Sequence, residues 1–370
     1  MTTPTTPAPP AGERLVSLDF FRGLTMFLLI GESTHLYSLL RGAAFDGTWL
    51  SFLGWQLEHH EWNGLHFWDL VQPFFMFIVG VAMPFAFAKR KATDHGLRSA
   101  WGHALWRSLM LLLFGIGLYC ISAGRMTFEL WNVLAQLSFT YLVAFLIMRR
   151  PAWFQIAFSL GLIAVSEILY RTFSVPGFNQ PFTPDHNFGS WVDLLLMGKL
   201  SGGHWVAFNA VPTAAHTIWG VVAGQWLRRS MPDRRKLLVL AAWGVLAVVV
   251  GYALDPITPI IKRICTSSFV IVSGGWCLLM LAFSYYIVDV KKWRTVPRFF
   301  TYVGMNSLFI YLFCHTDGAG WITGIVKPFT VALLGWWGAT YVSLAVALVT
   351  WLALWLLCYG LYRRKLFFKL

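Results

Sequence analysis

Long runs of apolar residues, separated by short polar connections, dominate the chain from residue 18 to residue 361. A helix needs about 20 consecutive, mostly apolar residues to cross a bilayer. Runs of that length predict an all-α, polytopic integral membrane protein with about ten transmembrane helices. The predicted helices cover residues 18–40, 67–88, 104–123, 131–148, 152–170, 208–228, 236–253, 265–288, 299–316 and 338–361.

Two segments fall outside this pattern. The Pro- and Thr-rich residues 1–13 are expected to form a disordered cytoplasmic tail, ahead of a single transmembrane domain over residues 14–370. Residues 319–335 are apolar but are interrupted by Gly, Lys and Pro. The sequence leaves open whether this segment is a re-entrant or an interfacial piece.

Composition and charge narrow the class of protein. Residues of the AVILMFWYC set make up 57% of the 370 residues, and charged residues only 12%. Soluble domains carry about 25% charged residues, so a soluble enzyme and a nucleic-acid-binding domain are excluded. With the N-terminus in the cytoplasm, 22 of the 29 Lys and Arg residues lie on the cytoplasmic side. This asymmetry matches the positive-inside rule and predicts cytoplasmic N- and C-termini.

Several polar side chains lie inside the predicted helices, where they are costly and usually face a cavity or a partner. In the outer half these are Glu32, Asp69, Gln72, His216 and His315, and Asn306 lies deeper in the ninth helix. As a set they predict a polar pocket that opens outward. The alternative is that a neighbouring helix satisfies each group separately.

Arg22 lies near the inner end of the first predicted helix, three residues after Asp19. Residues at this spacing share a helix face and can form an ion pair. The alternative is that Arg22 binds an anionic ligand, because a guanidinium group suits phosphate.

Two long outer connections, about 41–66 and 171–207, are rich in Trp, Phe and His. In the first, Glu58-His59-His60-Glu61 is followed by Trp62 and Asn63. A neutral imidazole accepts a proton near pH 7, and a neighbouring carboxylate raises its basicity. No HxxxH or HxH spacing is present, so no metal is expected, and a purely structural loop is the competing interpretation. The aromatic residues either stack on a ligand or form an interfacial belt.

Six pieces of the chain together resemble the heparan-alpha-glucosaminide N-acetyltransferase family and its bacterial membrane homologues. These pieces are RLVSLDFFRGLTMFLLIGE (14–32), HHEWNGLHFWDLVQPFFMFIVGVAM (59–83), WNVLAQLSFTYL (131–142), NAVPTAAHTIWGVVAGQWL (209–227), IKRICTSSFVI (261–271) and YVGMNSLFIY (302–311). They occur in the family's order. The chain departs from the eukaryotic members at Ser33, where they carry Asn, and at His60, where a small residue is usual.

The resemblance implies an enzyme that transfers an acetyl group from cytoplasmic acetyl-CoA to an amino sugar, of the glucosamine type, on the far side of the membrane. The family's active-site His precedes the Trp by three residues, which places it at His59. The resemblance also places the Asp of the family's D-L-V motif at Asp69 and its R-G pair at Arg22 and Gly23. We therefore expect His59 to act as base or acetyl carrier, with Asp69 or Glu32 orienting its ring.

The remaining predicted roles concern ligands and location. Arg22 is the predicted donor-binding residue, and Trp62, Asn63, Gln72, His216, Asn306 and His315 are the predicted acceptor-binding residues. No metal and no nucleic acid are expected. The expected surroundings are a bacterial inner membrane, and the resemblance makes a homodimer plausible. Two alternatives stay open, a transporter for an amino sugar or oligosaccharide and an O-acetyltransferase of an envelope glycan.

Overall fold

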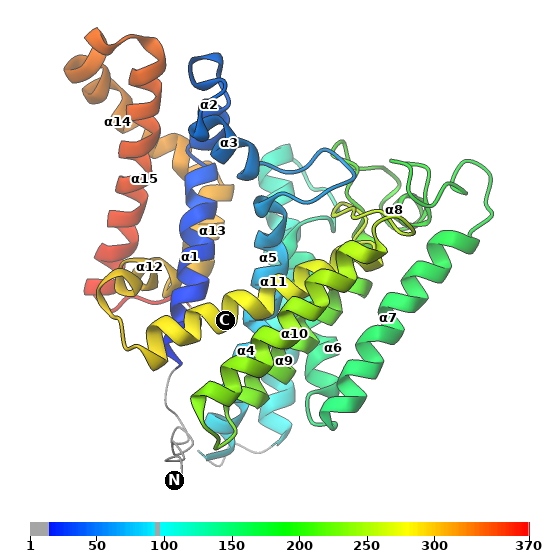
Figure 1. The fold of residues 1–370 in the computed structure, drawn as a ribbon. Coiled ribbons are helices and arrows are strands. Elements are labelled where there is room, and N and C mark those ends of the chain that lie inside the picture. The colour runs from blue at the N-terminus through cyan, green and yellow to red at the C-terminus, as the bar shows by residue number, and fades with distance from the viewer. Residues whose placement is uncertain (1–14, 93–96, 369) are drawn as a thin grey trace. The chain divides into compact units, whose positions relative to one another are not determined.

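The computed structural model describes residues 15–92, 97–368 and 370. These residues fold into helices joined by loops, without any β-strand in the described part of the chain (Figure 1). One isolated bridge pairs Asn63 with Ile261. The all-α fold predicted from the apolar pattern is therefore confirmed, while the predicted disordered tail, residues 1–13, lies outside the described residues.

The longer helices carry the labels of Figure 1. They are α1 (Val16–Glu32), α2 (Leu36–Leu40), α3 (Trp49–Gln56), α4 (Val71–Ala92), α5 (Leu97–Ala123), α6 (Val133–Ile147), α7 (Ala152–Thr172), α8 (Phe188–Met197), α9 (Ala210–Leu227), α10 (Asp233–Leu254), α11 (Ser267–Tyr285), α12 (Thr295–Gly304), α13 (Ser307–His315), α14 (Gly318–Leu334) and α15 (Ala339–Arg363). Short helical turns are η1 (Ala43–Phe45), η2 (Phe67–Leu70), η3 (Ala207–Asn209), η4 (Tyr286–Val290) and η5 (Gly335–Trp337).

Seven helical segments of the described residues are long and apolar enough to cross a bilayer. They are Phe67–Lys89, Ala100–Ala123, Ala152–Thr172, Asp233–Leu254, Ser267–Val290, Gly318–Trp337 and Ala339–Arg363. Six of them match predicted helices, which supports an integral membrane protein. The number of about ten and the cytoplasmic termini stay predictions.

The structure differs from the predicted helices in three places. The helix predicted over 18–40 breaks after Glu32, where His35 takes a left-handed backbone conformation with φ 59°. The helix predicted over 299–316 is divided into α12 and α13 at Asn306. The segment 319–335 forms the continuous helix α14 in spite of Pro328, as membrane-spanning helices tolerate a Pro whose freed carbonyl finds another partner.

The chain divides into two compact units. Of the described residues, the first unit contains residues 15–18, Glu61–Leu65 and Gln72–Val290. In it, α10 packs along α11, α5 along α6, and α9 contacts α6, α7 and α11. The outer connection predicted over 171–207 contains α8, and Glu61–Leu65 joins this unit through the bridge at Asn63 and a hydrogen bond from Gly64 N to Ile260 O at 2.8 Å.

The second unit contains Asp19–His60, His66–Val71 and Lys291–Leu370. In it, α14 and α15 lie side by side, and α15 also contacts α2 and α12 (Figure 1). The backbone of α1 touches α12 directly, because a Cβ atom on Gly23 would lie 2.1 Å from Phe300 O. The glycine of the sequence motif at 22–23 therefore has a packing role, which is to let two helices approach closely.

Candidate active site

The central feature of the second unit is a pair formed by an imidazole and a buried carboxylate. His59 Nδ1 lies 3.0 Å from Asp69 Oδ1. The Asp69 side chain is 1% exposed, whereas 35% of the His59 side chain is exposed. One end of the pair is therefore fixed in the protein interior, and the imidazole that it holds is accessible.

The local fold explains why Asp69 is held so firmly. Asp69 is the third residue of η2, and its Oδ2 accepts hydrogen bonds from the backbone N–H of His66 at 2.9 Å and of His60 at 3.3 Å. A carboxylate at the third position of a helix commonly bonds back to the N-cap N–H in this way. Asp69 thus accepts hydrogen bonds from both ends of segment 60–66, which directly follows His59.

A second set of contacts fixes that loop. His66 Nδ1 donates to Glu58 O at 3.0 Å, and Phe67 N donates to Gln56 Oε1 at 3.0 Å. The rings of Trp55 and His66 have centroids 4.2 Å apart. Because segment 55–58 is tied to segment 66–67, the intervening His59 has little freedom to move away from Asp69.

The pair determines which nitrogen of His59 is basic. An ionised carboxylate only accepts hydrogen bonds, so Nδ1 carries the proton that is shared with Asp69. In the neutral ring the lone pair then lies on Nε2. The same carboxylate stabilises the imidazolium ion that forms when Nε2 takes a proton. The arrangement is suited to general-base or nucleophilic catalysis.

Other predicted residues of the second unit are placed differently. Glu32 ends α1 with an exposed side chain, and the carboxylate that holds His59 Nδ1 is that of Asp69. His315 Nδ1 bonds to Tyr311 O at 3.0 Å. Asn306 is buried and uses both side-chain atoms on the C-terminal segment, donating to Leu366 O and accepting from Phe368 N. The roles of His315 and Asn306 in acceptor binding stay predictions, and so does a catalytic role of Glu32.

The predicted ion pair at the start of the same unit forms. Arg22 Nη1 lies 3.7 Å from Asp19 Oδ1, three residues earlier on α1. The Asp19 side chain is 8% exposed and that of Arg22 is 24% exposed. The interaction of Arg22 with the acetyl donor stays a prediction.

The remaining predicted residues belong to the first unit. Trp62 Nε1 donates to Phe182 O at 2.8 Å, and Gln72 Nε2 donates to the Gln136 side chain. His216 is fully buried, and its Nε2 lies 2.9 Å from Ser273 Oγ and 3.2 Å from Val270 O. Its contacts are those of a core residue between α9 and α11.

Sequence reasoning did not single out His66, which supports the pair through both its backbone and its ring. The signal was present, because His66 precedes Asp69 by the three-residue spacing that joins an N-cap to the third helical position. Over residues 15–89 and 100–368, no group of three or more His, Cys, Asp or Glu side chains is arranged to hold a metal ion.

Comparisons with known proteins give a distant relationship. No protein-family model matches the chain. The chain is 23% identical to heparan-alpha-glucosaminide N-acetyltransferase of Mus musculus over 429 aligned residues, which cover 97% of this chain and 61% of the mouse protein. It is 24% identical to the Homo sapiens protein of the same name over 426 residues, 96% of this chain and 60% of that protein. The chain thus spans about 60% of the length of these curated relatives. The resemblance predicted from the motifs is confirmed as a distant relationship.

Proposed function

We propose that this distant relative of heparan-alpha-glucosaminide N-acetyltransferase is a membrane acetyltransferase that moves an acetyl group from acetyl-CoA to the amine of an amino sugar. The observation that carries the proposal is the contact between His59 and Asp69. An accessible imidazole held by a buried carboxylate is the arrangement that acyl transfer needs. The similarity to the mouse and human enzymes supplies the reaction class.

In this proposal His59 is the general base. The amine nitrogen attacks the thioester carbonyl carbon while His59 Nε2 takes the proton that the amine loses. The C–S bond then breaks, and the CoA sulfur leaves as a thiol after receiving that proton from the imidazolium. Asp69 is a positioning residue, because it acts on the substrates only through the orientation and charge of His59.

His59 can also serve as the acetyl carrier within the same site. Its Nε2 would attack the thioester carbon and the C–S bond would break, releasing CoA as the thiolate and leaving an acetyl-imidazolium. In a second step the amine would take the acetyl group, and the proton that the amine loses would balance the thiolate charge. The two routes differ in one measurable way. A carrier releases CoA from acetyl-CoA before the amino sugar is present, whereas a base does not.

The side from which the donor enters and the location of the acceptor site are inferred from the sequence. Acetyl-CoA is expected to enter from the cytoplasm, where the predicted topology concentrates Lys and Arg. The acceptor amine is expected at an outward-facing site of a bacterial inner membrane. Trp62 and Asn63 are retained as acceptor-binding candidates because they lie three and four residues after His59 in the chain.

The test is CoA release by the purified, full-length protein in lipid nanodiscs. We expect free thiol and N-acetylglucosamine to appear together when acetyl-CoA and glucosamine are both supplied. His59→Gln should abolish both products, and His186→Gln is the matched control, since the His186 ring bonds to Gly177 O within its own loop. Acetylation of a hydroxyl-bearing glycan without glucosamine acetylation would favour the O-acetyltransferase. Uptake of labelled glucosamine into vesicles without acetyl-CoA would favour the transporter.

A further inference from the structure

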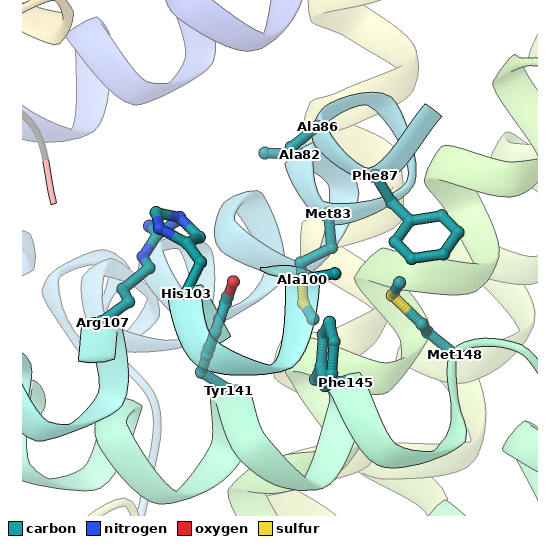
Figure 2. A pocket seen from close by; sticks show the side chains of 10 residues that line it. All are labelled: Ala82, Met83, Ala86, Phe87, Ala100, His103, Arg107, Tyr141, Phe145 and Met148. Atoms are coloured by element: carbon teal, nitrogen blue, oxygen red, sulfur yellow. The ribbon is translucent and has the colours of Figure 1, made fainter. Parts of the chain in front are cut away.

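A cavity in the first unit lies between α4, α5 and α6, and none of the predicted catalytic or binding residues lines it. It is lined by Ala82, Met83, Ala86, Phe87, Ala100, His103, Arg107, Tyr141, Phe145 and Met148 (Figure 2). Its volume is about 50 Å³. About 10–15 Å³ of such space holds one water, so the cavity has room for about four water-sized groups, which is the size of one phosphoryl group.

Two basic side chains of α5 line this cavity. His103 and Arg107 are four residues apart and share one face of the helix, and Figure 2 shows them projecting from the same side of α5. The Arg107 guanidinium carbon lies 4.8 Å from the centroid of the Tyr141 ring on α6. The cavity therefore combines two nitrogen donors with a phenol at one wall.

Among the residues that the structure describes, no carboxylate forms an ion pair with Arg107. It lies inside the membrane-spanning segment Ala100–Ala123, where a guanidinium is costly unless it is paired. Its Nε is buried without a hydrogen bond in the described part of the chain. The sequences of α4, α5 and α6 contain no Asp or Glu, so these helices offer no carboxylate to Arg107.

We propose that the cavity binds a phosphoryl group, with Arg107 as the main ligand and His103 and Tyr141 as further donors. A planar guanidinium forms paired hydrogen bonds to phosphate oxygens, and a bound phosphoryl group would supply the charge that the three helices lack. The group has two sources, a phosphate of the CoA donor or a phospholipid headgroup. The CoA source rests on the proposed function. Both the CoA phosphate and the phospholipid headgroup agree with the position of residues 103–107, which lie near the predicted cytoplasmic side.

The test is calorimetric binding of CoA, dephospho-CoA and pantetheine to the nanodisc-embedded protein, compared between wild type and Arg107→Gln. Pantetheine lacks every phosphate, so it reports on the rest of the donor. If the donor is the source, Arg107→Gln should raise the Kd of CoA by about tenfold or more, the effect of losing one charge-assisted contact, and leave the Kd of pantetheine unchanged. Arg150→Gln is the matched control, because Arg150 also faces an aromatic ring, that of Phe154.

The lipid source is distinguished by counting retained phospholipid with native mass spectrometry. A loss of bound phospholipid in Arg107→Gln, with CoA binding unchanged, would assign the site to a lipid headgroup. Equal weakening of CoA and pantetheine, or no change in either CoA binding or retained phospholipid, would overturn the phosphoryl site. Wild type that binds no CoA but retains phospholipid through Arg107 would contradict the proposed acetyl-CoA function and leave the anion site standing. Tyr141→Phe is the second variant if Arg107→Gln fails to fold. It should raise the Kd of CoA if CoA is the source, or lower the amount of retained phospholipid if a lipid headgroup is the source.

Discussion

His59 and Asp69 meet through a 3.0 Å contact between an accessible imidazole and a carboxylate that is 1% exposed. His59 lies within a loop whose two ends are tied together, by His66 to Glu58 and by Gln56 to Phe67. Because these bonds restrict the loop, the imidazole orientation is set before any substrate binds. Such preorganisation is what a catalytic base requires.

We predict that Asp69→Asn lowers kcat strongly with little change in KM. The amide cannot hold His59 in the tautomer with the lone pair on Nε2, and loss of a comparable carboxylate costs about 10⁴-fold in a hydrolase triad. A drop of about 100-fold or more is expected from steady-state rates. The acid limb of the pH–rate profile should also move to lower pH, since the imidazolium loses its carboxylate.

The matched variant for this prediction is Glu58→Gln, which removes an exposed ion pair with Arg41 on the same loop. It should leave kcat within about twofold, because exposed pairs contribute little. An Asp69→Asn enzyme with wild-type kcat and an unshifted pH profile would show that Asp69 has a structural role only.

His66 offers a test of the supporting loop. His66→Ala removes the bond from Nδ1 to Glu58 O and the ring contact with Trp55. We expect the free energy of unfolding to fall by about 1–3 kcal/mol and kcat to fall by about 10-fold or more, as for other residues that orient a functional group. Thermal melting and rate measurements on the same preparation check both effects, and an unchanged rate in a destabilised protein would limit His66 to a folding role.

The crossing of α4 and α9 in the first unit predicts a stability effect at a glycine. A Cβ atom on Gly80 would lie 2.0 Å from Thr217 O, so Gly80→Ala should force the helices apart and cost about 1–3 kcal/mol. Gly117→Ala is the control, because nothing lies within 4 Å of a Cβ atom there. Denaturation midpoints of the two variants should separate clearly, and equal midpoints would contradict the close approach.

Asp193 on α8 predicts a pH dependence of stability. Its Oδ2 accepts from Trp131 Nε1 at 2.6 Å and its Oδ1 from Ala207 N at 2.9 Å. Burial raises the pKa of the Asp193 carboxyl from 3.8 to about 6, against the lowering effect of these two bonds. The folded state therefore holds this proton more tightly than the unfolded state. The resulting stabilisation is complete below about pH 3.8 and is lost as the pH rises through about 6.

The measurement is the Tm of wild type and Asp193→Asn between pH 4 and pH 7.5. The Asn side chain does not titrate, so the Tm of wild type should fall relative to that of the variant as the pH rises through this range. Parallel curves for the two proteins would contradict the raised pKa.

The helical class and most spanning helices could be predicted because apolar length alone determines them. The breaks at His35 and Asn306 could not be predicted in this way, and Asn306 makes contacts with residues far away in the chain. Its side chain bonds the backbone of Leu366 and Phe368, 60 and 62 residues away. The apolar segment 319–335 looked interrupted, yet it lies almost wholly in one helix, α14, with Pro328 inside it.

The residues of the candidate site could likewise be predicted only in part from the sequence. His59 and Asp69 could be selected from residue type, position and family resemblance, and the structure places them in contact. His216 had the same polar character, but its bonds to Ser273 and Val270 place it in the core of the first unit. Arg107 could not be selected from the sequence, because the lack of Asp and Glu on α4, α5 and α6 has a meaning only once these helices are seen to line one cavity.

The central claim is that His59 performs the proton transfer or the acetyl transfer. The most direct measurement is the single-turnover rate of acetyl transfer from labelled acetyl-CoA to glucosamine, compared between wild type and His59→Gln at equal folded fractions. We expect the rate of His59→Gln to be lower than that of wild type by about 100-fold or more, which is the range for loss of a general base. A His59→Gln rate within about twofold of wild type, with both substrates bound, would contradict it.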